Sequence, residues 1–117
     1  LSISTNGGVS FTNRITSDGL GDNIVQGVYA DGSNVYAATN NGLSISTDGG
    51  ASFTNKTTDD GLVNNLVRGV YADGSNVYAA TDGGLSVSTD GGVSFTNKTT
   101  ADGLGSIIVA DVYSEWF

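Results

Sequence analysis

Residues 43–57 read LSISTDGGASFTNKT, and this stretch decides the fold because the chain contains it three times. It returns as LSISTNGGVSFTNRI at residues 1–15 and as LSVSTDGGVSFTNKT at residues 85–99, so successive copies lie 42 residues apart. Self-similarity at a period of roughly 20–50 residues indicates a repeat architecture, in which each unit buries its apolar face against a neighbour. We therefore divide the single segment 1–117 into repeats 1–42, 43–84 and 85–117, the last of them truncated.

Each repeat contains short apolar runs separated by turn signals. In the second repeat the runs are 43–47, 51–56, 66–72 and 77–81. The Asp-Gly dipeptides between them tolerate the positive φ of tight hairpin turns. A four-stranded sheet of about 40–45 residues is the size of a propeller blade. The sequence therefore predicts an all-β fold, a β-propeller of four-stranded antiparallel blades with a 42-residue repeat. In this prediction the chain begins in mid-blade and ends after an innermost strand.

Composition excludes several classes of function. The formal net charge is -8, with 4 basic residues in all, whereas nucleic acids and anionic membranes are bound by clusters of Lys and Arg. No apolar run approaches the roughly 20 residues that cross a bilayer. The chain has neither Cys nor His, so it lacks thiolate ligands and the commonest general base and metal ligand. We predict no nucleic-acid partner, no membrane insertion, no cofactor and no metal.

The repeated turn resembles the Asp-box, or BNR repeat, with the pattern Ser-x-Asp-x-Gly-x-x-aromatic. Segments 46–53 and 88–95 fit this pattern, and segment 4–11 fits it with Asn6 in place of Asp. The resemblance implies a propeller in which the box folds an outer hairpin, far from any substrate site. The carboxylate accepts turn N–H groups, the second Gly allows positive φ, and the aromatic ring packs between blades. The box residues are Ser4, Asn6, Gly8, Phe11, Ser46, Asp48, Gly50, Phe53, Ser88, Asp90, Gly92 and Phe95.

A second resemblance covers residues 61–85. This segment is similar to the propeller repeats of periplasmic sensor regions in bacterial two-component regulators. The resemblance implies an extracellular or periplasmic location in a bacterium. The near identity of the repeats is also typical of a designed or repeat-amplified propeller fragment.

Repeated aromatic residues are the candidates for ligand binding. Tyr29, Tyr71 and Tyr113 recur at one repeat position, where they either stack on sugars or pack between blades. Arg68 lies near the same predicted innermost strand and is a further candidate. Asp31 and its repeat counterpart belong to Asp-Gly-Ser-Asn segments, for which we favour a hairpin turn over a metal site.

The chain ends break the repeat and therefore bear on assembly. Fewer than three blades do not close a ring, since propellers typically have about 4–8 blades. Trp116 and Phe117 follow the point where the repeat ends, and they form either a cap or an interface anchor. We predict a ring closed by homo-oligomerisation, with a homodimer favoured over a homotrimer.

The predicted function is a non-catalytic binding or scaffold module, with multivalent binding of a glycan or another small ligand. One alternative is a designed or evolutionary-model propeller that has no ligand. A more distant alternative is a sialidase-like glycoside hydrolase, because sialidases carry Asp-boxes. That family uses three Arg residues, a Tyr nucleophile and an Asp acid. This chain has only Arg14 and Arg68, at non-equivalent repeat positions, so we predict no catalytic residues.

Overall fold

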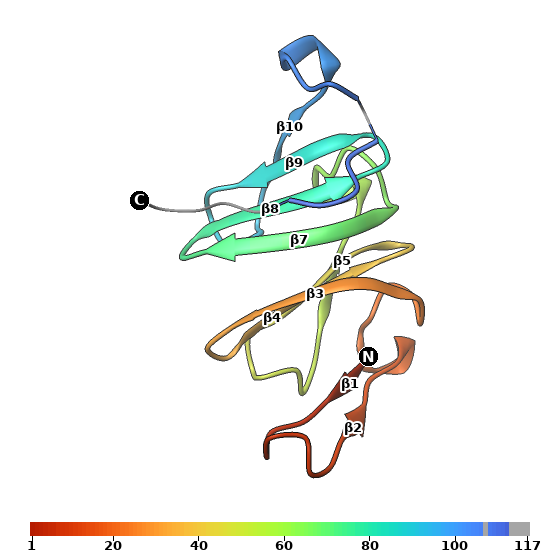
Figure 1. Cartoon of the computed structure of the whole chain (residues 1–117), viewed down its shortest axis with the longest axis vertical. Helices are drawn as coiled ribbons and strands as arrows, with labels where there is room; N and C mark the ends of the chain where they lie inside the picture. The colour runs from red at the N-terminus through yellow and green to blue at the C-terminus, as the bar shows by residue number, and fades with distance from the viewer. Residues whose placement is uncertain (107, 113–117) are drawn as a thin grey trace.

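A computed structural model describes residues 1–106 and 108–112 and shows an all-β chain built around two four-stranded antiparallel sheets (Figure 1). The first sheet has the order β3 (Val25–Asp31), β4 (Asn34–Thr39), β5 (Gly42–Ser46) and β6 (Thr54–Lys56). The second has the order β7 (Val67–Asp73), β8 (Asn76–Thr81), β9 (Gly84–Ser88) and β10 (Thr96–Lys98). Every strand of the second sheet begins 42 residues after its counterpart. The predicted four-stranded antiparallel sheets are therefore confirmed.

The two ends of the chain form less than a full sheet. The N-terminal hairpin pairs β1 (Ser2–Ile3) with β2 (Thr12–Asn13), the counterparts of the two outer strands of each sheet. At the other end we predicted an innermost strand; its described part, within residues 108–112, forms no strand, and its remainder lies outside the described residues. The physical reason is the missing partner, because the third copy has no counterpart of β4 and β8 with which to form a ladder.

Three short 3-10 helices follow the outermost strands: η1 (Thr16–Asp18), η2 (Thr58–Asp60) and η3 (Thr100–Asp102). In each, the last Asp carboxylate accepts a hydrogen bond from the backbone N–H three residues earlier, at 2.9–3.0 Å. Thr57 and Thr99 add a hydroxyl that accepts a second backbone N–H, whereas Ile15 at the same position has no hydroxyl. The loops between blades are thus held locally by residues that the repeat supplies.

The Asp-Gly-Ser-Asn segments form hairpin turns between the first two strands of each sheet. Asp31 pairs with Asn34 and Asp73 with Asn76, at the ends of the β3–β4 and β7–β8 ladders. Both ladders also contain a register shift after their first residue, which is a β-bulge at Gln26 and at Arg68. The turn interpretation that we favoured over a metal site agrees with this register.

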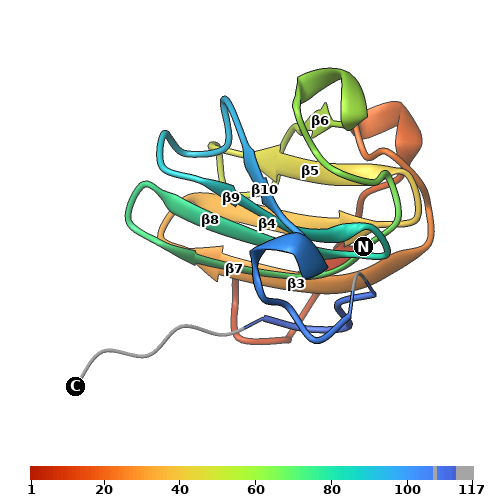
Figure 2. The same ribbon diagram turned by 90° about the horizontal axis from the view of Figure 1, so that it is seen from above.

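The apolar core lies between successive sheets. One layer joins the N-terminal hairpin to the first sheet and includes Leu20, Val35, Ala37 and Phe53. The other joins the two four-stranded sheets. Its buried residues are Tyr36, Ala38, Leu43, Ile45, Leu62, Val67, Val70, Ala72, Val77 and Ala79. Figure 2 shows the second sheet stacked over the first, and Figure 1 shows β3 and β7 side by side.

Candidate functional site

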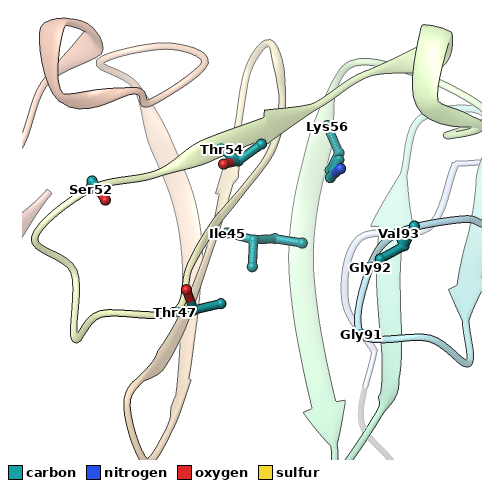
Figure 3. Close-up of a pocket in the computed structure, with 8 residues that line it drawn as sticks. All are labelled: Ile45, Thr47, Ser52, Thr54, Lys56, Gly91, Gly92 and Val93. Carbon is teal, nitrogen blue, oxygen red and sulfur yellow. The ribbon is translucent and has the colours of Figure 1, made fainter.

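Two equivalent pockets lie between successive outer hairpins. The larger, of about 200 Å³, lies between the β5–β6 hairpin and the turn that follows β9 (Figure 3). Its lining residues are Ile45, Thr47, Ser52, Thr54, Lys56, Gly91, Gly92 and Val93. The second, of about 180 Å³, is lined by Ile3, Thr5, Thr12, Arg14, Asp48, Gly49, Gly50 and Ala51. Most of these positions are those of the larger pocket shifted by one repeat, so the chain forms the same kind of pocket twice.

An isoleucine and a glycine that line each pocket lie in close contact. Figure 3 shows Ile45 pointing from β5 toward the turn at Gly92, and a Cβ added at Gly92 would collide with Ile45 Cδ1. Ile3 and Gly50 make the equivalent contact in the second pocket. Both glycines also have positive φ, 94° at Gly92 and 92° at Gly50. Glycine is therefore required at this position both by the backbone conformation and by the packing of the preceding hairpin.

The turn beside each pocket is held by one carboxylate and two serines. Ser46 Oγ donates to Asp48 Oδ1 at 2.6 Å, and Gly50 N–H donates to Ser46 Oγ at 2.8 Å. Ser52 donates to Asp48 twice, through its N–H at 3.0 Å and its hydroxyl at 2.6 Å. The turn between β9 and β10 repeats this arrangement with Ser88, Asp90, Gly92 and Ser94.

The first hairpin forms the same network without a charge. Asn6 Oδ1 accepts from the Ser4 hydroxyl at 2.9 Å and from the Ser10 N–H at 3.0 Å. Its Nδ2 donates to Ser10 Oγ at 2.8 Å, where an aspartate would accept instead. Gly8 N–H donates to Ser4 Oγ at 2.8 Å. An amide therefore replaces the carboxylate with no loss of the turn geometry.

Hydrogen bonds lower the pKa of both turn carboxylates. The Ser46 hydroxyl makes the largest contribution at Asp48, followed by the hydroxyl and the N–H of Ser52, and together they hold its pKa well below the usual range. The pKa of Asp90 is lowered in the same way, first by Ser88 and then by Ser94. Both groups stay ionised at all but strongly acidic pH, and in that state they are hydrogen-bond acceptors rather than proton donors.

We expect the stability of the chain to fall in acid because of these two carboxylates. An unfolded Asp binds its proton near pH 4, whereas Asp48 and Asp90 resist protonation in the folded state. Their stabilising contribution is therefore complete above about pH 5 and is lost as the pH falls below about 4. Urea unfolding between pH 3 and pH 7, followed by circular dichroism, measures this decline.

The control for this prediction is the double variant Asp48→Asn and Asp90→Asn. Asn6 shows that an amide can form the turn, so the variant should keep its fold and lose the part of the pH dependence that these two groups cause. A double variant whose stability declines in acid as steeply as that of the unsubstituted chain would contradict the assignment.

Each pocket also contains one cationic side chain. Lys56 comes from β6, is half-buried and forms no ion pair with any described residue. Arg14 follows β2; its Nη1 lies 3.7 Å from Asp18 Oδ1. Its Nε is buried and has no hydrogen-bond partner within the described part of the chain. In a chain with net charge -8, these cations give each pocket a local donor for a ligand rich in oxygen acceptors.

The predicted ligand-binding residues lie elsewhere. Tyr29 and Tyr71 pack on each other with ring centroids 4.9 Å apart, and Tyr29 also packs against the core between the sheets. Arg68 forms an ion pair with Asp82, in which its Nε and Nη2 each contact one carboxylate oxygen. Gln26 and Asn40 form the uncharged counterpart of this pair, at 2.8 Å. None of these residues lines either of the two pockets.

Three predicted residues fall outside the described part of the chain. They are the ligand-binding candidate Tyr113 and the interface candidates Trp116 and Phe117.

The aromatic residues at the ends of the first two repeated turns, Phe11 and Phe53, differ in burial. Phe53 is 9% exposed and packs on the N-terminal hairpin, whereas Phe11 is 63% exposed.

Sequence reasoning missed the pocket residues Thr47, Thr54 and Lys56. A signal for them exists, because three of the four basic residues occupy one repeat position, as Arg14, Lys56 and Lys98. Hydroxyl residues recur beside them at the same spacing. The proximity of the basic residues to the next turn only emerges when the sheets are stacked.

Comparison with known proteins gives a likeness to solved structures. No family model and no curated protein matches the chain, whereas nine chains of solved structures do. Among these is an ancestral GH74 enzyme, with 32% sequence identity over 63% of this chain and a TM-score of 0.56. The match covers 10% of that enzyme, so the chain spans about a tenth of its length. The likeness and the antiparallel four-stranded sheets are consistent with blades of a β-propeller.

The described residues contain no group of three or more acidic side chains arranged to hold a metal ion. Within the same residues, no helix has the length and apolar character needed to cross a bilayer.

Proposed function

We propose that this chain is a non-catalytic binding module of the Asp-box propeller class, and that its repeated outer pockets bind a small, hydroxyl-rich ligand such as a short glycan. One observation carries the proposal: the same pocket recurs one repeat later with a threonine pair and a cation in equivalent places. Near-identical sites on one chain favour multivalent binding, in which weak contacts add up to a higher avidity.

The chemistry of the pocket supports a glycan. Thr47 and Thr54 offer hydroxyls that both donate and accept, and Lys56 donates to an acceptor oxygen. The Ser52 hydroxyl donates its proton to Asp48, so it offers a ligand only an acceptor oxygen. Ile45 and Val93 supply the apolar side, as small-molecule sites generally require. At about 200 Å³ the pocket is smaller than the roughly 300–1,000 Å³ typical of drug-sized ligands, which favours a ligand of one or two sugar units.

The likeness to an ancestral GH74 enzyme favours a second candidate, a propeller that hydrolyses glycosidic bonds. Such chemistry generally needs a pair of carboxyl groups, one of them with a raised pKa that lets it act as an acid. The described Asp residues with displaced pKa values are Asp48, Asp82 and Asp90, and all three are displaced downward. We therefore propose binding rather than hydrolysis, and an aryl-glycoside reporter that releases its chromophore in the presence of the chain would favour the enzyme.

We propose an extracellular or periplasmic location, because the segment 61–85 resembles periplasmic sensor repeats. A designed or evolutionary-model propeller with no ligand is the alternative to binding, and the titration below separates the two.

The test is a titration of the full chain with glucose, N-acetylglucosamine and galacturonic acid, followed by isothermal calorimetry. The variants Lys56→Gln and Arg68→Gln are compared, because Lys56 lines the outer pocket and Arg68 is the sequence-predicted site residue. We expect at least one sugar to bind, Lys56→Gln to weaken its binding, and Arg68→Gln to leave it unchanged.

Two results would contradict the proposal. Binding that is lost in Arg68→Gln and kept in Lys56→Gln would place the site at the tyrosine pair instead. The absence of heat for all three sugars, with the chain folded, would favour the propeller without a ligand.

A further inference from the structure

The outward face of the second sheet repeats a face that is covered inside the molecule. In the first sheet this face consists of Tyr36, Ala38, Leu43 and Ile45, all of which are buried against the second sheet. One repeat later the same face consists of Tyr78, Ala80, Leu85 and Val87. Leu43 is fully buried, whereas Tyr78, Leu85 and Val87 are only half-buried; Ala80, which lies opposite Leu85, is 0% exposed. We call these four later residues the outward face.

The N-terminal end of the stack exposes the complementary surface. Val28 on β3 is 53% exposed, whereas its counterpart Val70 on β7 is 7% exposed. Phe11 is 63% exposed, whereas its counterpart Phe53 is 9% exposed. Val28 is exposed because the N-terminal hairpin lacks the two inner strands that would cover it. Phe11 is exposed because no sheet precedes that hairpin among the described residues. We call these two residues the inward face.

The C-terminal segment follows the path of an inner strand although it forms none. A Cβ added at Gly27 would lie 3.3 Å from Arg68 O and 3.5 Å from Gly69 Cα of the next repeat. A Cβ added at Gly69 would lie 3.5 Å from Ala110 O and 3.4 Å from Asp111 Cα, which are the same atoms one repeat later. Ala110 and Asp111 therefore lie against β7 at Gly69 as Arg68 and Gly69 lie against β3 at Gly27. In the repeat this is the innermost position of a sheet, and β1 and β2 are the counterparts of the two outer strands.

We propose that a second copy of this chain docks head to tail on the outward face, with its β1–β2 hairpin beside segment 108–112 of the first copy. This docking repeats the contact between the two four-stranded sheets, because the residues involved occupy the same positions in the repeat. In this docking, Val87 takes the place of Ile45 and contacts the partner's Gly8. Gly8 is exposed, whereas its counterparts Gly50 and Gly92 are buried against Ile3 and Ile45.

Docking completes a third outer pocket. Val87, Thr89, Ser94, Thr96 and Lys98 are the counterparts of the residues that β5, β6 and their turn give to the larger pocket. The turn that closes this third pocket comes from the second copy, through the partner's Gly7, Gly8 and Val9. The two copies dock through packing of their side chains, whether or not the pockets bind a sugar.

Head-to-tail contacts close into a ring when the rotation per copy fits. The described residues of each chain supply two four-stranded sheets and, for a third, two outer strands and a segment in the innermost position. Two copies therefore give six blade positions and three give nine. Since propellers typically have about 4–8 blades, the two-copy ring is the expected assembly.

Light scattering behind a sizing column tests the proposal on the full chain. We expect a mass of two copies for the unsubstituted chain and of one copy for Val87→Glu and for Val28→Glu, which change opposite faces. The matched control is Val93→Glu, since Val93 is 68% exposed on a turn outside both faces and should keep the two-copy mass. Far-UV circular dichroism checks that each variant retains its sheets.

Mixing the two one-copy variants distinguishes head-to-tail docking from other dimers. A mixture retains one intact outward face and one intact inward face, so we expect part of the two-copy mass to return. A one-copy mass for the folded, unsubstituted chain would overturn the proposal. A two-copy mass for Val28→Glu with a one-copy mass for Val87→Glu would also overturn it, because two outward faces would then dock on each other.

Discussion

Replacing Leu43 by alanine is expected to lower the free energy of unfolding by about 2–5 kcal/mol, the usual cost of removing a buried leucine. Leu43 lies on β5, is 0% exposed and belongs to the apolar layer between the two sheets. The chain contains no Cys, so no disulfide links the two sheets. The apolar layer between them therefore holds the repeats against each other. Urea unfolding followed by circular dichroism measures the change.

Leu85 provides a matched control for this prediction. It is the same residue at the same strand position one repeat later, and it is only half-buried. Comparing Leu43→Ala with Leu85→Ala in a Val87→Glu background keeps the outward face open during the measurement. We expect the loss at Leu43 to be clearly larger. Equal losses at the two positions would mean that contact between successive sheets is not the source of stability.

Replacing Gly42 by alanine is expected to cost about 3 kcal/mol or more, the combined effect of left-handed strain and overpacking. Gly42 opens β5 with φ 109°, a conformation that L-residues rarely adopt. A Cβ at this position would also collide with the Lys56 carbonyl oxygen on the neighbouring strand β6. Backbone atoms cannot rotate away as a side chain can, so the hairpin that carries the larger pocket would have to shift.

The control is Gly74→Ala, in the β7–β8 turn. Gly74 has φ 61°, and a Cβ added there would meet no atom within 4 Å. It shares the backbone strain without the collision, so we expect a loss of about 1–2 kcal/mol. Thermal melts of both variants compare the two effects, and a loss at Gly42 no larger than that at Gly74 would contradict the packing described for β5 and β6.

The strands and turns of this chain were predictable from sequence because each signal occurs two or three times. Asp-Gly turns and alternating apolar residues are ambiguous singly, but recurrence at a fixed spacing ties each to one place in a repeating unit. The turn network of Ser46, Asp48 and Ser52 is local, so the order of these residues is enough to predict it. The absence of a strand at residues 108–112 was not predictable in this way, because a strand there depends on a partner strand that the third copy lacks.

The outer pockets were not predictable from sequence because they join residues of different repeats. Lys56 and Gly92 line one pocket although they belong to successive hairpins, and only the stacking of the two sheets brings them together. The tyrosines were chosen because they recur and are aromatic, but these properties also suit packing between strands. Tyr29 and Tyr71 in fact contact each other. Recurrence therefore identifies equivalent positions, whereas stacking determines what those positions face.

The most direct test of the central claim, that the repeated outer pockets are the binding sites, is an amide NMR titration of the full chain with the best-binding sugar of the three. The claim predicts shifts at Thr47, Lys56 and Gly92 together with their counterparts Thr5, Arg14 and Gly50, at similar sugar concentrations. Shifts concentrated at Tyr29, Tyr71 and Arg68, with the outer hairpins unchanged, would contradict it.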